Sequence, residues 1–252
     1  MVNNFPYTID NKRYYTLDYY YKQRYGKKVF KVSLNLNLTC PNIDGTKSYG
    51  GCIFCSKSGS GDFAGDVNDS LMMQFIKGKK RMQSKWPNAK FIAYFQARTN
   101  TYADVDTLEK YFEPFINNKD CVGLAIATRS DSISNSCLDY LESISKRCYL
   151  QVELGLQSSK KETLKLINRG ETVEEFETMV NKLRARNINV VVHIINGLPY
   201  ETDNDMLDTV KYLNKLDIQG IKIHMLHILK DTPLEIMYKN HPFKVLTKDE
   251  YV

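Results

Sequence analysis

The sequence predicts an α/β fold in which six parallel strands alternate with helices. Short runs rich in β-branched and aromatic residues alternate with stretches of helical period, and this order is typical of a parallel sheet. The predicted strands cover residues 30–36, 91–95, 122–127, 149–154, 189–194 and 220–226. Six βα units form either an open doubly wound sheet or a partly closed barrel, and in both folds ligands bind at the carboxyl ends of the strands.

Two of the connecting helices begin with a capping-box pattern, in which a threonine or serine precedes a glutamate by three residues. Thr172 with Glu175 starts one helix, and Ser159 with Glu162 starts the helix before it. Gly170 is expected to end that earlier helix, because glycine readily adopts the left-handed conformation found at helix C-termini. Both helices fall between the fourth and fifth predicted strands.

The composition is that of an ordinary globular protein. Of the 252 residues, 42% are hydrophobic and 25% are charged, which excludes disorder, collagen and coiled coil as the dominant state. One large domain is expected at this length. No run approaches the roughly 18 apolar residues that span a bilayer, and residues 1–10 lack the apolar segment of a signal peptide. We therefore expect a cytoplasmic protein that does not enter a membrane.

The net charge of +6 is concentrated in two segments. Residues 1–31 hold seven lysines and arginines against two aspartates, and residues 70–98 hold seven more with no acid. Six of the seven tyrosines in the first segment lie close together, at positions 14, 15, 19, 20, 21 and 25. Basic and aromatic side chains together suit a polyanion such as RNA. The alternative is a solvated helix whose tyrosines anchor it to the rest of the fold.

The chain divides into a basic, tyrosine-rich N-terminal extension, residues 1–30, and a core domain, residues 31–252. Thr247 and Glu250 form a further capping box, yet the sequence stops at Val252 within the first turn of that helix. A C-terminally truncated core is therefore expected.

Three cysteines fall in one loop directly after the first predicted strand. Cys40, Cys52 and Cys55 have the spacing C-x11-C-x2-C. A structural zinc site takes four protein ligands, so three are an incomplete set. A [4Fe–4S] cluster held by three cysteines leaves one iron open to a substrate or cofactor. Iron–sulfur, zinc and unligated thiols all remain open from the spacing alone.

The other three cysteines are predicted to be small core residues. Cys121 lies at the start of a predicted strand, and Cys137 and Cys148 flank a predicted helix. Burial as a small apolar side chain is common for free cysteine. None of them is expected to complete the ligand set.

The cysteine spacing, with the aromatic Phe54 before the last cysteine, resembles the radical S-adenosylmethionine superfamily. Within it, the sequence is similar to the branch of the Elongator catalytic subunit and, more closely, to the YhcC/YtqA-type proteins. The similarity covers nearly the whole chain, and five stretches in order carry it: TCPN with DGT at 39–46, GSGDFAG at 59–65, YFQA at 94–97, VELGLQ at 152–157 and GLP at 197–199. The resemblance implies a partial (β/α)6 TIM-like barrel.

The resemblance also implies the cofactors and the chemistry. Cys40, Cys52 and Cys55 would bind a [4Fe–4S] cluster, whose open iron would bind the amino and carboxylate groups of S-adenosylmethionine. An electron from a donor such as flavodoxin or ferredoxin would then cleave the sulfonium bond, and a 5′-deoxyadenosyl radical would abstract a hydrogen atom from the substrate. The protein would position both partners and exclude water.

Six further residues match cofactor-binding positions of the family. Phe54 matches an aromatic near the adenine. Gln96 stands where many members carry a glutamate that receives the methionine amino group, and this departure brings no charge. Thr128 ends the third strand at the height of the cofactor.

Gln157 and Arg169 match a glutamine and an arginine that contact the ribose and the methionine carboxylate, and an arginine fork suits a carboxylate. His193 matches an acidic position that binds the ribose in some relatives.

Three more polar residues have ambiguous orientations. Glu153 faces either the ribose or substrate or, by strand alternation, the helices. His224 and His227 are three residues apart, so a straight strand would send them to opposite faces, and only His227 is expected near the strand end.

The resemblance points to tRNA as the substrate, because the Elongator-like branch modifies wobble uridine and YhcC/YtqA-type proteins are linked to its aminomethyl side chain. Three alternatives are a small-molecule substrate, a zinc-stabilised RNA-binding module, and a barrel that binds S-adenosylmethionine without cleaving it. Iron content and release of 5′-deoxyadenosine distinguish the enzyme from the last two alternatives, and mass spectrometry of wobble nucleosides from a deletion strain tests the tRNA substrate.

Overall fold

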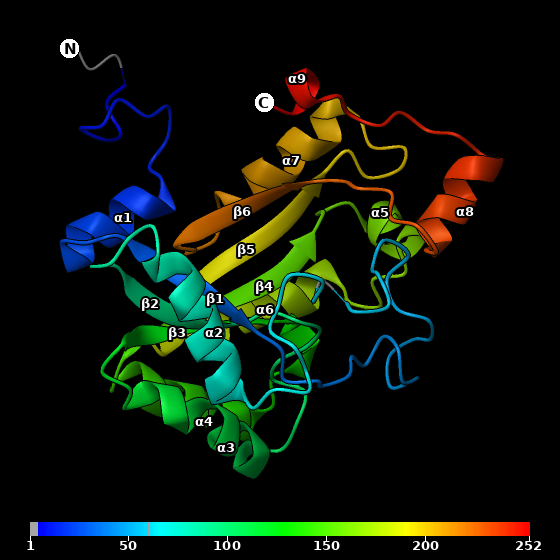
Figure 1. Cartoon of the computed structure of the whole chain (residues 1–252). Coiled ribbons are helices and arrows are strands. Elements are labelled where there is room, and N and C mark those ends of the chain that lie inside the picture. Colours follow the sequence, from blue (N-terminus) through cyan, green and yellow to red (C-terminus); the bar gives the residue numbers. More distant parts are fainter. Residues whose placement is uncertain (1–4, 60) are drawn as a thin grey trace.

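Six parallel strands form one curled sheet with helices along its outer side, as Figure 1 shows for the computed structural model, which describes residues 5–59 and 61–252. Ser60 of the stretch 59–65 lies outside the described residues. The strands are β1 Val29–Leu34, β2 Lys90–Phe95, β3 Cys121–Thr128, β4 Tyr149–Gln157, β5 Asn189–Asn196 and β6 Gly220–Met225. They neighbour one another in sequence order, and every pair is parallel. The prediction of a partial (β/α)6 barrel is confirmed.

The nine α-helices of the described residues connect the strands or flank the sheet. Their bounds are α1 Leu17–Tyr25, α2 Leu71–Gln83, α3 Val105–Ile116, α4 Asn135–Ser145, α5 Lys161–Leu166, α6 Val173–Ala185, α7 Asp203–Leu213, α8 Pro233–Asn240 and α9 Lys248–Tyr251, and a 3-10 turn, η1, covers Ser130–Ser132. None of the described helices is long and apolar enough to cross a bilayer.

The capping patterns are confirmed at two helices and wrong at one. Thr172 caps α6, and Thr247 caps α9, each with a complete capping box. Helix α5 starts after Lys160 without a side-chain cap, because the Ser159 hydroxyl is hydrogen-bonded to Thr209 instead, at 3.1 Å. It ends at Leu166, and the left-handed residue nearest its end is Asn168, not Gly170.

Strand alternation separates an apolar outer layer from a polar interior. The outward side chains pack against the helices in one core, which includes Leu34, Phe95, Ile126, Val152, Val192, Phe75, Phe112, Leu138 and Phe176. Positions that alternate with this core on the strands carry lysine, tyrosine, glutamate and histidine. TIM barrels normally fill this interior with branched aliphatic side chains, so a polar filling points to binding or catalysis.

Helix α1 covers the amino ends of β3 and β4. Tyr21 is buried and, with Tyr25, packs edge-on against Tyr149 at the start of β4, while the Arg24 guanidinium lies 5.0 Å from the centre of the Tyr149 ring. Tyr14 remains exposed. Most tyrosines of α1 therefore anchor the helix to the barrel.

The three remaining cysteines lie apart from the loop of Cys40. Cys137 is fully buried in α4, and Cys121 and Cys148 are half-buried against the same apolar core. Burial raises the pKa of Cys137 to about 12 and that of Cys148 to about 11. Their place in the core agrees with the sequence prediction.

Candidate cofactor pocket

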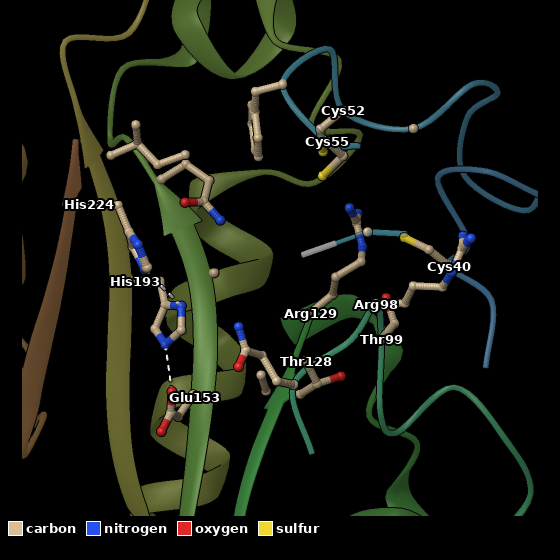
Figure 2. Close-up of a pocket in the computed structure, with 18 of the residues that line it drawn as sticks. Cys40, Cys52, Cys55, Arg98, Thr99, Thr128, Arg129, Glu153, His193 and His224 are labelled. Atoms are coloured by element: carbon tan, nitrogen blue, oxygen red, sulfur yellow. Dashed lines mark hydrogen bonds and ion pairs between the residues drawn. The ribbon is translucent and has the colours of Figure 1, made fainter. Parts of the chain in front are cut away.

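A pocket of about 610 Å³ opens at the carboxyl ends of the strands, and Figure 2 shows part of its lining. All nine residues that the sequence singled out for metal or cofactor binding line it: Cys40, Cys52, Phe54, Cys55, Gln96, Thr128, Gln157, Arg169 and His193. They come from β2 to β5 and from the loops after β1 and α5. Their convergence follows from the parallel sheet, which brings the carboxyl ends of all strands to one edge.

The cysteine loop is held by hydrogen bonds to the segment between α5 and α6. The buried Asn42 amide donates to the Asn168 carbonyl. Asn168 in turn donates to the carbonyls of Tyr49, at 3.0 Å, and Gly51, at 2.8 Å. The Ile53 amide donates to the Ile167 carbonyl at 3.1 Å. These contacts fix the loop that carries the thiols against residues 167–168.

The thiols offer the donor set of a thiolate-ligated centre. Figure 2 shows Cys52 beside Cys55, with Cys40 apart from both and near Arg98. The hydrogen bond from Cys55 lowers the pKa of Cys52, against the effect of burial, and the charge of Arg169 lowers it further. The same hydrogen bond, with burial, raises the pKa of Cys55. The pair thus favours a thiolate on Cys52.

The three thiols are not gathered around one point in this structure. Within residues 5–59 and 61–252, no three side chains of histidine, cysteine, aspartate or glutamate gather closely enough to hold a metal ion. Binding one centre through all three thiols therefore requires Cys40 to approach the other two. Three soft thiolate donors without a fourth side chain fit a [4Fe–4S] cluster better than a closed zinc site.

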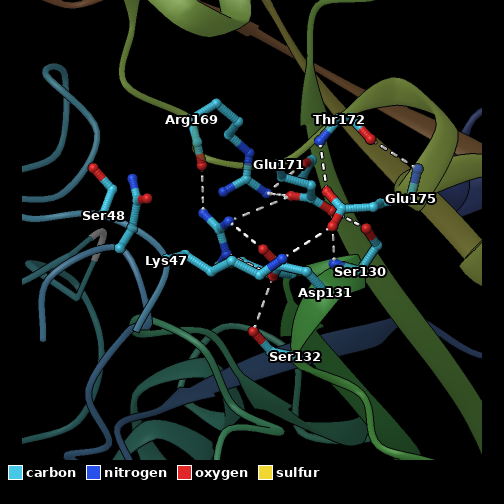
Figure 3. Close-up of polar contacts among 12 residues, drawn as sticks. Lys47, Ser48, Ser130, Asp131, Ser132, Arg169, Glu171, Thr172 and Glu175 are labelled. Atoms are coloured by element: carbon cyan, nitrogen blue, oxygen red, sulfur yellow. Dashed lines mark hydrogen bonds and ion pairs between the residues drawn. The ribbon is translucent and has the colours of Figure 1, made fainter. Parts of the chain in front are cut away.

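Two buried arginines, Arg129 and Arg169, form a network with two carboxylates, and Figure 3 shows part of it. Arg129 binds Asp131 through two hydrogen bonds, at 2.8 Å and 2.6 Å, and donates to the Arg169 carbonyl at 2.8 Å. Arg169 pairs with Glu171 at 2.6 Å, and Glu171 also accepts from the Ser130 amide at 3.0 Å. Two positive and two negative charges balance each other here, so neither arginine is an uncompensated buried charge.

The two acids of this network respond differently to burial. Burial raises the pKa of both, but the hydrogen bonds and charge of Arg129 outweigh it at Asp131, whose pKa is lowered. At Glu171 burial prevails over the charge of Arg169, and the pKa is raised. Arg129 and both acids had no place among the predicted site residues, because only the fold brings residues 129–131 beside residues 169–171.

Gln157 and Arg169 meet at an irregular end of β4. The pairing of β4 with β5 shifts register between Gly155 and Gln157, and Gln157 has φ +72°, an unfavourable value for a residue with a side chain. The Nε atom of Arg169 is buried and has no hydrogen-bond partner among the described residues. A buried donor of this kind next to a pocket is a site for a ligand acceptor.

Two of the predicted residues line the pocket with polar groups that already have partners, and a third, Phe54, is apolar. The Gln96 Oε1 atom accepts from the Ser33 hydroxyl at 2.9 Å. The Thr128 hydroxyl is 2.6 Å from that of Thr101. Phe54 is half-buried and packs against a small apolar cluster near α5 and α8. Of these, Phe54 offers the pocket an apolar surface.

A chain of hydrogen bonds runs through the interior of the barrel to the pocket (Figure 2). The Glu153 Oε2 atom lies 2.7 Å from His193 Nε2, and His193 Nδ1 lies 3.4 Å from His224 Nε2. The other Glu153 oxygen accepts from the Lys31 ammonium and from the Gln151 amide, the latter at 2.7 Å. These five side chains come from β1, β4, β5 and β6.

The charges in this chain are fixed by burial and pairing. Burial would raise the pKa of Glu153, but the hydrogen bond from His193 and the charge of Lys31 hold it well below its usual range. Burial lowers the pKa of His193 and brings that of His224 to about 4. At neutral pH the chain therefore contains one carboxylate and two neutral imidazoles.

The orientation of these residues answers the ambiguities of the sequence. Glu153 faces the interior and not the helices. Both His224 and His227 line the pocket, so the expectation of opposite faces is wrong. Strand β6 ends at Met225, and beyond that point the chain no longer alternates. Ile221 and Ile223 are exposed and therefore lie on the outer face of β6. Because side chains alternate along a strand, His224 lies on the inner face.

Comparison with known proteins gives the family. The model of the radical SAM superfamily matches residues 48–213, and that of the Radical_SAM C-terminal domain matches residues 218–252. The protein YtqA of Bacillus subtilis is 49% identical over 99% of this chain and 78% of its own length. The protein YhcC of Escherichia coli K12 is 34% identical over 82% of this chain and 66% of its own length.

More distant matches extend to named tRNA proteins and to solved structures. The tRNA uridine(34) acetyltransferase of Methanocaldococcus infernus is 29% identical over 52% of this chain and 25% of its own length. The structure of the archaeal Elp3 from the same organism superposes with a TM-score of 0.64 at 19% identity, covering 88% of this chain. This chain spans 51% of that Elp3 chain, about half of its length. The curled sheet, the three-cysteine loop and the matching family models together establish that this chain belongs to the radical SAM superfamily.

Proposed function

We propose that this chain reductively cleaves S-adenosylmethionine and uses it to modify the side chain of wobble uridine in tRNA. The observation that carries the first part is the convergence of three thiols and six matching polar or aromatic residues on one pocket. The family implies a [4Fe–4S] cluster and S-adenosylmethionine as cofactors. Cys40, Cys52 and Cys55 would hold the cluster, which supplies the electron that breaks the sulfonium bond.

The residues around the thiols have roles in binding and orientation. Arg169, fixed by Glu171 and Gly155, directs its unpartnered Nε–H toward a carboxylate acceptor such as that of the methionine moiety. Gln157, beside it, supplies an amide for the ribose. Phe54 covers the adenine with an apolar face. An external protein such as flavodoxin or ferredoxin provides the electron.

The tRNA part is supported by relatives and by charge. A tRNA uridine(34) acetyltransferase matches about half of the chain. On the chain itself, Lys80, Arg81 and Lys85 are exposed and have no ion pair among the described residues. They lie at the end of α2 and in the loop before β2, at the amino ends of the strands. This basic surface would anchor the tRNA backbone away from the pocket, which receives the target base.

Two assays test the two parts separately. The anaerobically reconstituted protein, reduced with dithionite, should release 5′-deoxyadenosine from S-adenosylmethionine. Under the same conditions, tRNA from a strain lacking the gene should gain a modified wobble uridine, detected by mass spectrometry of its nucleosides. An unchanged nucleoside profile with continued 5′-deoxyadenosine release would reject the tRNA substrate and keep the enzyme. A protein that binds zinc and releases no 5′-deoxyadenosine would reject both.

A further inference from the structure

Both ring nitrogens of His193 have protein partners, so this residue has none left for a ligand. Its Nε2 atom faces Glu153 at 2.7 Å, and its Nδ1 atom faces His224 at 3.4 Å. The group at the end of the chain, and next to the pocket, is His224. The ligand contact that the sequence predicts for His193 is therefore expected at His224, on the neighbouring strand β6.

The direction of every hydrogen bond in the chain follows from the charge of Glu153. Its Oε1 atom accepts from Lys31 and Gln151, and an ionised carboxylate can only accept. His193 must then carry its proton on Nε2 to donate to Oε2. A neutral imidazole has one proton, so His193 Nδ1 is an acceptor.

The same step repeats at His224. Its Nε2 atom must carry the proton in order to donate to His193 Nδ1, which leaves His224 Nδ1 as an acceptor. Within residues 5–59 and 61–252, no protein group hydrogen-bonds to that Nδ1 atom. The side chain of His224 lines the pocket. We infer that His224 Nδ1 is a binding contact that accepts a hydrogen bond from a ligand O–H or N–H, with its polarity set by Glu153 through His193.

This contact has a defined selectivity. A ligand hydroxyl or imide N–H satisfies it, whereas a carbonyl or carboxylate oxygen placed there would face a lone pair. Two sources have the required chemistry, namely a ribose hydroxyl of S-adenosylmethionine and an N–H of a substrate nucleobase. Glu153 and His193 are positioning residues, since they act on the ligand only through His224.

The first test needs no ligand and does not depend on the proposed function. Long-range ¹H–¹⁵N correlation spectra of the reconstituted protein, with ¹⁵N-labelled histidine, report the protonated nitrogen of each imidazole. His193 and His224 should both carry the proton on Nε2 at neutral pH. A proton on Nδ1 of His224 would overturn the inference. In Glu153→Gln, which can donate as well as accept, the tautomers should become mixed. Should this variant fail to fold, the wild-type spectrum still decides.

The second test uses two substitutions that divide the functions of His224. His224→Gln places an amide near the Nε2 position and keeps the link to His193, but it removes the acceptor at Nδ1. His224→Asn keeps an acceptor near the Nδ1 position and loses the link. Isothermal titration calorimetry with S-adenosylmethionine and with an anticodon stem-loop RNA, unmodified or carrying N3-methyluridine, distinguishes the two sources.

His224→Gln should weaken one of the two probes about tenfold, as expected for one lost hydrogen bond, while His224→Asn should stay within about threefold of wild type. Weaker S-adenosylmethionine binding identifies the ribose. Weaker stem-loop binding that N3-methylation reproduces in the wild type identifies the nucleobase. Wild-type affinity of His224→Gln for both probes would contradict a ligand contact at Nδ1. If the stem-loop fails to bind wild type while S-adenosylmethionine binding responds to His224→Gln, the tRNA proposal fails and this inference stands.

Discussion

Gly155 and Arg169 meet at the carboxyl end of β4, where the Arg169 Nη2 atom lies 2.5 Å from the Gly155 carbonyl oxygen. A Cβ atom on residue 155 would come within 2.6 Å of the Gln157 amide nitrogen and 3.4 Å of Arg169 Nη2. The absence of a side chain at this position therefore lets two cofactor-binding candidates pack against the strand.

Gly155→Ala should displace the Gln157 amide and weaken binding of S-adenosylmethionine. Because this amide is the end of a flexible side chain that can move away, the free energy of unfolding, measured by urea denaturation, should change little. The matched control is Gly220→Ala on β6, where the added Cβ would meet only Val191, at 3.3 Å. Equal cofactor affinity in Gly155→Ala and wild type would show that the Gln157–Arg169 corner lies outside the cofactor site.

Cys52→Ala should abolish the metal centre. The wild-type protein, purified anaerobically and reconstituted, is expected to contain roughly four iron and four sulfide per chain, and the variant almost none. Cys137→Ala is the control, because Cys137 is buried in α4 within the apolar core. Iron and sulfide analysis with the visible absorption spectrum measures both. Loss of iron from the Cys137 variant would mean that the ligands are assigned wrongly.

Acid should destabilise the fold through His224. Its pKa in the folded protein is about 4, because burial and the charges of His193 and Lys222 oppose protonation, while an unfolded histidine titrates near 6.5. Between these two values the unfolded state binds more protons, so the free energy of unfolding falls as the pH falls, by at most about 1.4 kcal/mol per pH unit.

His224→Asn removes this titration, and its unfolding free energy should depend less on pH between about 4 and 6.5. Urea denaturation at several pH values compares the two proteins. The groups that face His224 are His193, Glu153, Lys222 and His227, and all of them remain in the variant. Parallel pH profiles for wild type and variant would place the folded pKa of His224 near its unfolded value.

Replacing Lys80, Arg81 and Lys85 together by alanine should weaken tRNA binding and make it less sensitive to salt. Each phosphate contact adds about 0.7–0.9 to the slope of log affinity against log salt, so the slope should fall by about 2–3. A control triple replaces Lys182, Lys211 and Lys215, which are exposed on or just after α6 and α7. Filter-binding titrations at several salt concentrations measure both. Identical slopes for the two triples would exclude the α2 surface as the anchor.

The sheet could be predicted well because each strand is a short run rich in β-branched, aromatic or other apolar residues between clear breaks. The second strand, predicted at 91–95, is observed at Lys90–Phe95, and the fifth, predicted at 189–194, continues only to Asn196. The fourth strand continues to Gln157, three residues beyond the prediction, through a register shift that no local pattern signals. The cysteine spacing can be read from the chain itself and predicts this loop as the metal-binding loop, and that role stays a prediction.

The polar interior could not be predicted, because it depends on which strands become neighbours. Lys31 and Glu153 are 122 positions apart in the sequence, and they meet only when the sheet curls and brings β1 toward β4. Lys31 was counted among the basic residues of the N-terminal segment, yet its charge is neutralised by the buried ion pair with Glu153. Charge counted along a sequence therefore overstates the charge available to a partner.

The asparagine contacts between the cysteine loop and residues 167–168 have a consequence for metal loading. Asn42 and Asn168 hold the two segments together by hydrogen bonds. The backbone around Cys52 is thereby ordered by the fold, so binding of an iron–sulfur unit there costs less conformational entropy than binding to an unstructured peptide would. Loading of the metal should accordingly resemble binding to a folded site more than coupled folding and binding.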